Sequence, residues 1–123
     1  MRIEVICTGD EVLTGKTINT NFSMISQKLE DAGLAVEWET TVGDDRDNLL
    51  LAFELAGRRA DAVIVNGGLG PTVDDLSQEI AAKAAGVALA LNEDWLLRME
   101  GYFKSRGRVM PSNNRKQAML PAG

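Results

Sequence analysis

The chain has 123 residues, is 45% hydrophobic and carries 18 acidic against 13 basic side chains, for a net charge of −5. It contains no histidine, which excludes an imidazole base and an imidazole metal ligand. The single Cys7 excludes an internal disulfide and a thiolate zinc site, so any bound metal is expected to be a hard cation such as Mg²⁺.

The composition predicts one domain that is reduced, soluble and cytoplasmic. No apolar run approaches the roughly 18 residues of a membrane span, and the charged start over residues 1–4 does not fit a secretion signal. An acidic chain disfavours nucleic acid as a partner. The helix predicted over 93–105, with Trp95 and Phe103, is expected to pack in the ordinary way.

The charge is distributed unevenly along the chain. Residues 1–100 carry all 18 acids and eight bases, whereas residues 101–123 carry five bases and no acid. Either the tail differs by chance, or the acidic body handles a metal while the basic tail handles an anion.

Apolar runs and helical periods alternate along the chain. In order, they predict a strand over 3–7, a helix over 21–32, a strand over 34–42, a helix over 47–59, a strand over 62–66, and helices over 74–85 and 93–105. This alternation predicts a three-layer αβα domain with a mostly parallel sheet. The strand over 62–66 is almost wholly apolar and is expected to be covered on both faces. The expected core is Val5, Ile6, Phe22, Ile25, Leu29, Leu51, Leu55, Val63, Ile64, Val65 and Ile80.

Each predicted strand is followed by a polar loop that contains glycine, over residues 8–15, 43–47 and 66–75. In a parallel sheet these loops leave the same edge, where α/β proteins bind their ligands. We therefore expect the three loops to converge on one site.

The segment Asn66-Gly67-Gly68-Leu69-Gly70-Pro71-Thr72 is the most informative of the three. Its glycines allow close backbone approach, and the loop runs into a helix start whose N–H groups suit a phosphate. It lacks the lysine of a P-loop and the spacing of the dinucleotide fingerprint. It predicts either a phosphate cradle or a tight strand-to-helix turn.

Two acid pairs, Asp44-Asp45 and Asp74-Asp75, follow the second and third strands. Both suit helix starts, and Thr72 with Asp75 fits a capping box. Four carboxylates beside an anion site would, however, repel a phosphate. A divalent cation removes this conflict, because Mg²⁺ is bound by one or two carboxylates plus phosphate oxygens. Capping and metal binding stay open as alternatives.

The basic residues Arg115 and Lys116 follow Pro111 and a capping residue, Ser112 or Asn113. In the first turn of a helix their charge would oppose the helix dipole, which is consistent with an anion held between them. The alternative is an irregular, solvated loop.

Six motifs occur in order along the chain. They are Thr8-Gly9-Asp10-Glu11-Val12-Leu13-x-Gly15, Asn19-Thr20-Asn21, Val42-Gly43-Asp44-Asp45, Gly67-Gly68-Leu69-Gly70-Pro71-Thr72-x-Asp74-Asp75-Leu76-Ser77, Gly107-Arg108-x-Met110-Pro111 and Asn113-Asn114-Arg115-Lys116-Gln117-Ala118. In these motifs the chain resembles, over essentially its whole length, the N-terminal domain of the competence/damage-inducible protein CinA. That domain is similar to the molybdopterin-binding domains of molybdenum-cofactor biosynthesis. The commoner pattern has Thr where this chain has Ser77.

The resemblance implies a molybdopterin-binding type of fold and self-association as a dimer or trimer. Relatives continue beyond residue 123, so the domain is expected to lack a C-terminal segment. The CinA branch is associated with metal-dependent hydrolysis of nucleotide pyrophosphates such as ADP-ribose. Its nicotinamide-mononucleotide deamidase activity belongs to a separate C-terminal domain. Molybdopterin adenylyltransferases have an arginine where this chain has Asp74.

The resemblance also implies roles for individual residues. Asp44 and Asp75 are expected to be catalytic, and both are expected to bind Mg²⁺ with support from Asp45 and Asp74. The expected phosphate- or nucleotide-binding residues are Thr8, Gly9, Asp10, Glu11, Gly67, Gly68, Gly70, Pro71, Thr72, Ser77, Arg115 and Lys116. The ligand is expected to be a small nucleotide or pterin phosphate. The alternatives are a binding module without turnover and a purely structural domain.

Overall fold

The computed structural model describes residues 1–123 and contains eleven helices and strands. They are β1 (Ile3–Thr8), α1 (Asp10–Leu13), α2 (Thr20–Asp31), β2 (Val36–Val42), α3 (Arg46–Arg59), β3 (Ala62–Asn66), α4 (Ser77–Ala85), β4 (Leu89–Leu91), α5 (Glu93–Ser105), the 3₁₀ helix η1 (Ser112–Ala118) and β5 (Met119–Pro121). The strands and helices predicted up to residue 105 are all present. The short elements α1, β4 and β5 were not predicted, since four or fewer residues show no clear period.

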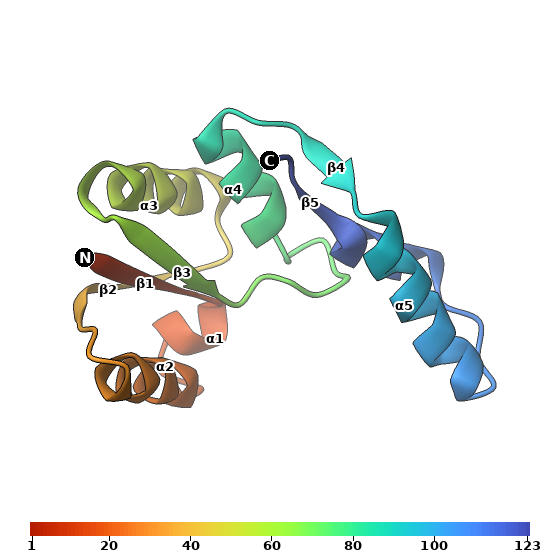
Figure 1. Cartoon of the computed structure of the whole chain (residues 1–123), viewed down its shortest axis with the longest axis horizontal. Helices are drawn as coiled ribbons and strands as arrows, with labels where there is room; N and C mark the ends of the chain where they lie inside the picture. Colours follow the sequence, from red (N-terminus) through yellow and green to blue (C-terminus); the bar gives the residue numbers. More distant parts are fainter.

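A parallel sheet with the strand order β2-β1-β3 forms the middle layer of the fold. α2 lies on one side of this sheet, and α3 lies on the other side next to α4 (Figure 1). The prediction of a three-layer α/β domain with a mostly parallel sheet is therefore confirmed. None of the helices combines the length and the apolar character needed to cross a membrane.

The central strand β1 is buried along its whole length and sets the register of its neighbours. Thr8 at its end pairs with Val42 at the end of β2, and Cys7 pairs with Asn66 at the end of β3. The carboxyl ends of the three strands therefore lie side by side, as the sequence predicted.

The last third of the chain forms an arm that projects from the three-layer body (Figure 1). Antiparallel β4 and β5 form its base, and α5 extends outward. α5 contains no buried residue, and Trp95 is 46% exposed. Leu96, Met99 and Phe103 are half-buried, so the expected packing of this helix is partial and does not include Trp95.

The core lies between β1, α3 and α4 and differs in part from the predicted one. Val5, Ile6 and Ile80 are buried as predicted. Leu51 and Leu55, by contrast, are exposed, because α3 turns a different face toward the sheet. That face is made of residues four and three positions apart, namely Leu49, Phe53 and Ala56. Five further predicted core residues are only half-buried: Phe22, Ile25, Leu29, Ile64 and Val65.

Strand β3 is not covered on both faces, which corrects a second prediction. Val63 and Val65 share one face of this strand and line an open groove beside α3 and α4, and Val63 is 37% exposed. An apolar run predicts a strand, but it does not tell how completely helices cover its faces.

Two helix starts also differ from the predictions. α4 begins at Ser77 rather than near residue 74, because Asp75 hydrogen-bonds within the preceding loop. The segment after Pro111 is a 3₁₀ helix that carries Arg115 and Lys116 in its last turn. Positive charge is favourable at that end of a helix, so the predicted conflict with the dipole does not arise.

A buried carboxylate on β1 connects the sheet to the end of α3. Glu4 is 1% exposed and accepts hydrogen bonds from Arg59 Nε and Nη2 at 2.8 and 2.7 Å. Thr40 Oγ1 donates a third bond at 2.8 Å, and the guanidinium of Arg59 lies 4.7 Å from the ring centre of Trp38. The bonds from Arg59 lower the pKa of Glu4 more than burial raises it, and Thr40 adds to the lowering.

We expect Glu4→Gln to lower the free energy of unfolding at pH 7 by about 2 kcal/mol, because charge-assisted hydrogen bonds are lost. The folded-state pKa of Glu4 lies below its unfolded value, so its contribution is present above the unfolded pKa and disappears as pH falls through the folded one. Urea titrations between pH 3 and 7 should therefore show that the free energy of unfolding falls less steeply with decreasing pH in the variant than in the wild type. Glu30→Gln, which removes an exposed carboxylate on α2, should match the wild type. Equal slopes for Glu4→Gln and wild type would contradict the role of this ion pair.

Candidate functional site

The loops after β1, β2 and β3 meet at one edge of the sheet, where the first loop is fastened to the second. The N–H of Gly9 donates to the carbonyl oxygen of Val42 at 3.0 Å. Gly9 has a φ of 137°, and a Cβ there would lie 2.6 Å from Oε1 of Glu11. Glycine is therefore required at the point where the Glu11 carboxylate approaches the backbone.

Two aspartates clasp the first and second loops together. The N–H of Asp10 donates to Oδ2 of Asp44 at 3.2 Å, and the N–H of Asp44 donates to Oδ1 of Asp10 at 2.8 Å. A Cβ at Gly43 would lie 2.5 Å from that same Oδ1. The clasp therefore holds two like charges close together and depends on the absence of a side chain at residue 43.

The glycine loop, residues 67–75, begins in a backbone conformation that favours glycine. Gly67 and Gly68 have φ values of 107° and 68°. A Cβ at Gly67 would lie 2.7 Å from both oxygens of Thr8, and one at Gly68 would collide with the side chain of Ser77. These two positions exclude side chains both by their φ angles and by the lack of space.

Ser77 fastens this loop to the start of α4. It is 2% exposed, its Oγ donates to the carbonyl oxygen of Gly67 at 2.7 Å, and its N–H donates to that of Gly68 at 3.1 Å. The hydroxyl proton of Ser77 is therefore committed to the loop, so its effect on a bound phosphate would be indirect.

The glycine loop has hydrogen-bond donors without acceptors. The N–H groups of Gly67, Gly68 and Leu69 donate to no atom of the protein. Beside them lies Thr8, which is 6% exposed. Its Oγ1 is buried and has no hydrogen-bond partner. The unpaired buried hydroxyl of Thr8 is unusual, and the N–H groups of half-buried Gly67 and Gly68 and of exposed Leu69 beside it are open to an acceptor such as a phosphate oxygen.

Asp75 holds the far end of the glycine loop. Its Oδ2 accepts from the N–H of Thr72 at 2.9 Å and from the hydroxyl of Thr72 at 2.7 Å, and a Cβ at Gly70 would lie 2.5 Å from the same oxygen. Burial opposes ionisation, but the bonds from Thr72 and the charge of Lys116 hold the pKa of Asp75 below its ordinary value. The capping-box prediction is wrong, because α4 starts later and has no side-chain cap.

Asp44 lies in the opposite electrostatic situation. Burial raises its pKa, and the charges of Asp10, Glu11 and Asp74 raise it further, while the N–H of Asp10 opposes the increase. Asp44 and Asp75, the two acids that the resemblance singles out, therefore have pKa values shifted in opposite directions. The shift at Asp75 follows from its bonds within the glycine loop, whereas the shift at Asp44 follows from burial and acidic neighbours.

The four predicted metal-binding acids do not form a closed cage. Oδ1 of Asp45 caps α3 by accepting from the N–H of Asn48 at 2.9 Å, so the capping interpretation is confirmed for this residue. No three acidic or thiol side chains lie close enough to hold a metal ion by themselves. Exposed Asp74 and half-buried Asp44 offer hard oxygen donors at the loops, which fits Mg²⁺ that is completed by water and phosphate oxygens.

Part of the basic tail reaches the glycine loop. Nζ of Lys116 donates to the carbonyl oxygen of Thr72, whereas exposed Arg115 makes no hydrogen bond or ion pair. Sequence reasoning missed Gln117, whose Nε2 donates to the carbonyl oxygen of Leu69 at 3.2 Å. Its position beside Lys116 in the motif 113–118 was the available signal, and an amide alone does not reveal its partner.

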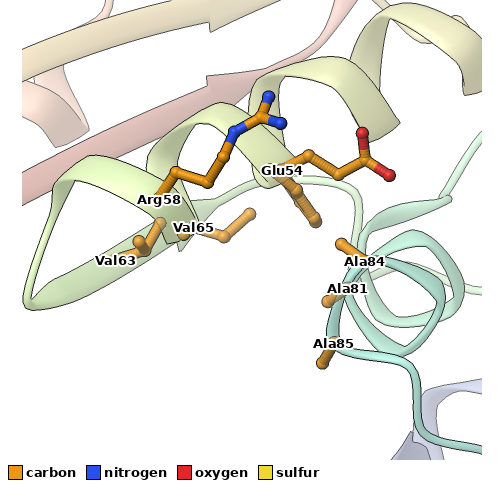
Figure 2. A pocket seen from close by; sticks show the side chains of 9 residues that line it. Glu54, Arg58, Val63, Val65, Ala81, Ala84 and Ala85 are labelled. Carbon is orange, nitrogen blue, oxygen red and sulfur yellow. The ribbon is translucent and has the colours of Figure 1, made fainter.

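A groove of about 680 Å³ lies away from these loops, between α3, the open edge of β3 and α4 (Figure 2). Val63 and Val65 line it from β3, and Ala81, Ala84 and Ala85 line it from α4. None of the predicted site residues takes part in it. The converging loops therefore form a site separate from this groove.

Comparison with known proteins places the chain in a family. Residues 4–122 match the family described as "Probable molybdopterin binding domain". The chain is 44% identical over 121 residues to a nicotinamide-nucleotide amidohydrolase PncC from Shewanella oneidensis, with coverage of 98% of the chain and 28% of the relative. It is 48% identical over 122 residues to a CinA-like protein from Escherichia coli, with coverage of 99% and 30%. The chain thus spans less than a third of the length of these relatives.

Solved structures agree with the sequence comparison. CinA from Thermoplasma acidophilum superposes with a TM-score of 0.85 at 36% identity, covering 98% of this chain and 70% of that one. The molybdopterin biosynthesis enzyme MoaB from Thermus thermophilus superposes with a TM-score of 0.66 at 18% identity, covering 98% and 74%, which shows the shared fold. The chain therefore belongs to the molybdopterin-binding domain family, as a CinA-like member.

Proposed function

We propose that this domain binds the phosphates of a nucleotide on its glycine loop and hydrolyses a phosphoanhydride, as in ADP-ribose, with the help of a divalent cation. The observation that carries the proposal is the set of free N–H groups on Gly67, Gly68 and Leu69 beside the unpaired hydroxyl of Thr8. Donors in this arrangement bind phosphate oxygens without a lysine of the P-loop type.

The acids supply the other half of the proposed site. Asp44 and Asp74 are the residues that would hold the cation, directly or through water, with Asp75 and Asp45 in support through the oxygens that their own hydrogen bonds leave free. When bound, Mg²⁺ supplies charge neutralisation and a water molecule of lowered pKa. Asp44 lies among the like charges of Asp10, Glu11 and Asp74, and this crowding of negative charge favours a cation beside it. Lys116 at the loop offsets negative charge on the phosphates.

The family comparison is consistent with a nucleotide as the ligand. The Shewanella oneidensis relative is named as a nicotinamide-nucleotide amidohydrolase, and this chain corresponds to 28% of its length. A domain that binds a nucleotide in such a protein need not carry the amidohydrolase reaction itself. Self-association as a dimer or trimer stays a prediction.

A second candidate is a binding module that holds a nucleotide or pterin phosphate without turnover. It is favoured by the absence of a cluster of three carboxylates and by the use of Asp75 to hold Thr72. The two candidates separate in one experiment with wild-type protein, ADP-ribose and Mg²⁺ or Mn²⁺. A thermal shift together with release of AMP and ribose 5-phosphate supports hydrolysis. A thermal shift without products supports the binding module, and the absence of both contradicts hydrolysis and leaves only a module for another ligand, such as a pterin phosphate.

We expect Asp44→Asn to reduce ADP-ribose hydrolysis at least about 100-fold, because the cation would lose a charged ligand and its stabilisation of the transition state is worth several kcal/mol. The same variant should keep or raise Tm at pH 7, because the raised pKa shows that the ionised form is disfavoured in the fold and the amide oxygen can still accept from Asp10. Below the pKa of Asp44 the wild-type rate should fall. Asp47→Asn, a change to an exposed acid in the first turn of α3, should leave rate and Tm near wild type.

We expect Gly68→Ala to weaken ADP-ribose binding more than tenfold, measured by calorimetry. An alanine at this φ is strained, and its methyl group collides with Ser77, so the loop and its N–H groups must move. Gly57→Ala is the matched control, since a methyl group there meets no atom within 4 Å. Because Gly57 lies inside α3, this control should gain up to about 1 kcal/mol in stability and bind normally. Unchanged binding by folded Gly68→Ala would place the phosphates elsewhere.

A further inference from the structure

A second, partly aromatic pocket of about 510 Å³ lies between α5 and η1. Its walls include the rings of Trp95, Tyr102 and Phe103, and its polar groups are Arg98 and the amides of Asn114 and Gln117. Apolar walls with a few polar groups are the composition of small-molecule sites. No acidic side chain lines this pocket, although the chain as a whole is acidic.

Trp95 on α5 is open to a ligand, whereas Tyr102 is packed edge-on against Phe103 and has the guanidinium of Arg106 at 4.7 Å from its ring centre. Asn92 caps the helix by accepting from the N–H of Trp95 at 2.9 Å, and acids in the first turn with Lys104 in the last complement its dipole. Trp95 and Tyr102 are 46% and 55% exposed.

One side chain joins this pocket to the glycine loop. Oε1 of Gln117 accepts from Nδ2 of Asn114 at 2.8 Å, and Nε2 of Gln117 donates to the carbonyl oxygen of Leu69 at 3.2 Å. Leu69 is the residue whose own N–H is free to bind a phosphate. Gln117 therefore contacts both the aromatic pocket and the glycine loop.

We propose that this pocket holds the planar nitrogen heterocycle of the same nucleotide whose phosphates bind the glycine loop, an inference that rests on the proposed function. Aromatic side chains stack on ring faces, and Arg98 can lie over such a ring. The second N–H of Gln117 and Oδ1 of Asn114 have no hydrogen-bond partner and can pair with groups on the ring edge.

The charge of the pocket selects among rings. Arg98 brings a positive charge, and no carboxylate in the lining balances it. A neutral ring such as adenine or a pterin is therefore favoured over a positively charged pyridinium ring, since like charges repel at short distance. The pocket thus distinguishes ligands that carry the same ribose phosphate.

Three probes with one phosphate each test this inference in the presence of Mg²⁺: AMP, nicotinamide mononucleotide and ribose 5-phosphate. In a Trp38→Phe background, Trp95 is the remaining tryptophan, so its fluorescence reports on the pocket. AMP should quench it saturably and bind at least about fivefold more tightly than ribose 5-phosphate, as one stacked ring predicts. Nicotinamide mononucleotide should bind no better than ribose 5-phosphate. Equal affinities for all three probes without quenching would overturn the inference.

Trp95→Ala should weaken AMP binding by roughly fivefold to 150-fold, the range for loss of one stacking partner, and leave ribose 5-phosphate binding unchanged. Leu97→Ala is the control on the same helix, since Leu97 is 66% exposed and does not line the pocket. If Trp95→Ala fails to fold by circular dichroism, Tyr102→Ala provides the same test.

Binding measurements on the two variants and the wild type distinguish a wrong ring site from a wrong phosphate site. If folded Trp95→Ala binds AMP as tightly as wild type while Gly68→Ala loses binding, the ring lies elsewhere and the phosphate site stands. If wild-type protein binds none of AMP, ribose 5-phosphate and ADP-ribose, both are wrong.

Discussion

The parallel pairing of β1 with both of its neighbours is the constraint on which the other features depend. Because β1 is buried along its length and its register aligns Thr8 with Val42 and Cys7 with Asn66, three loops far apart in sequence leave the sheet at one edge. Without that alignment the acids after β2 and the free N–H groups after β3 would have no reason to meet. The chemistry of the site is thus a consequence of strand register.

The polar groups at this edge divide into those that build the loops and those that stay available. Ser77 and Asp75 form hydrogen bonds with residues of the glycine loop, and Asp45 forms one with the start of α3. Asp44, by contrast, is held among like charges that raise its pKa. Acids that look equivalent in the sequence therefore differ in their hydrogen-bond partners and, for Asp44 and Asp75, in the direction in which their pKa is shifted.

Much of the fold could be predicted from the sequence, because alternating apolar runs and helical periods are local signals. β3 and α5 begin and end where their patterns do, and the convergence of the loops follows from the parallel sheet. The exposure of Val63 and Leu51 could not be predicted, since burial depends on which neighbour an element meets. Likewise, the sequence does not show that Asp75 accepts from Thr72 within the loop, since this bond depends on the conformation of the glycine loop before α4.

Three of the glycines at the site each lie against one carboxylate: Gly9 against Glu11, Gly43 against Asp10 and Gly70 against Asp75. A side chain at any of them would have to displace the acid that it faces, along with the negative charge placed there. The positions most sensitive to replacement are therefore ones that carry no functional group at all. Replacing one of these glycines would therefore move a carboxylate and change the electrostatic field of the site, although the charged residue itself is not mutated.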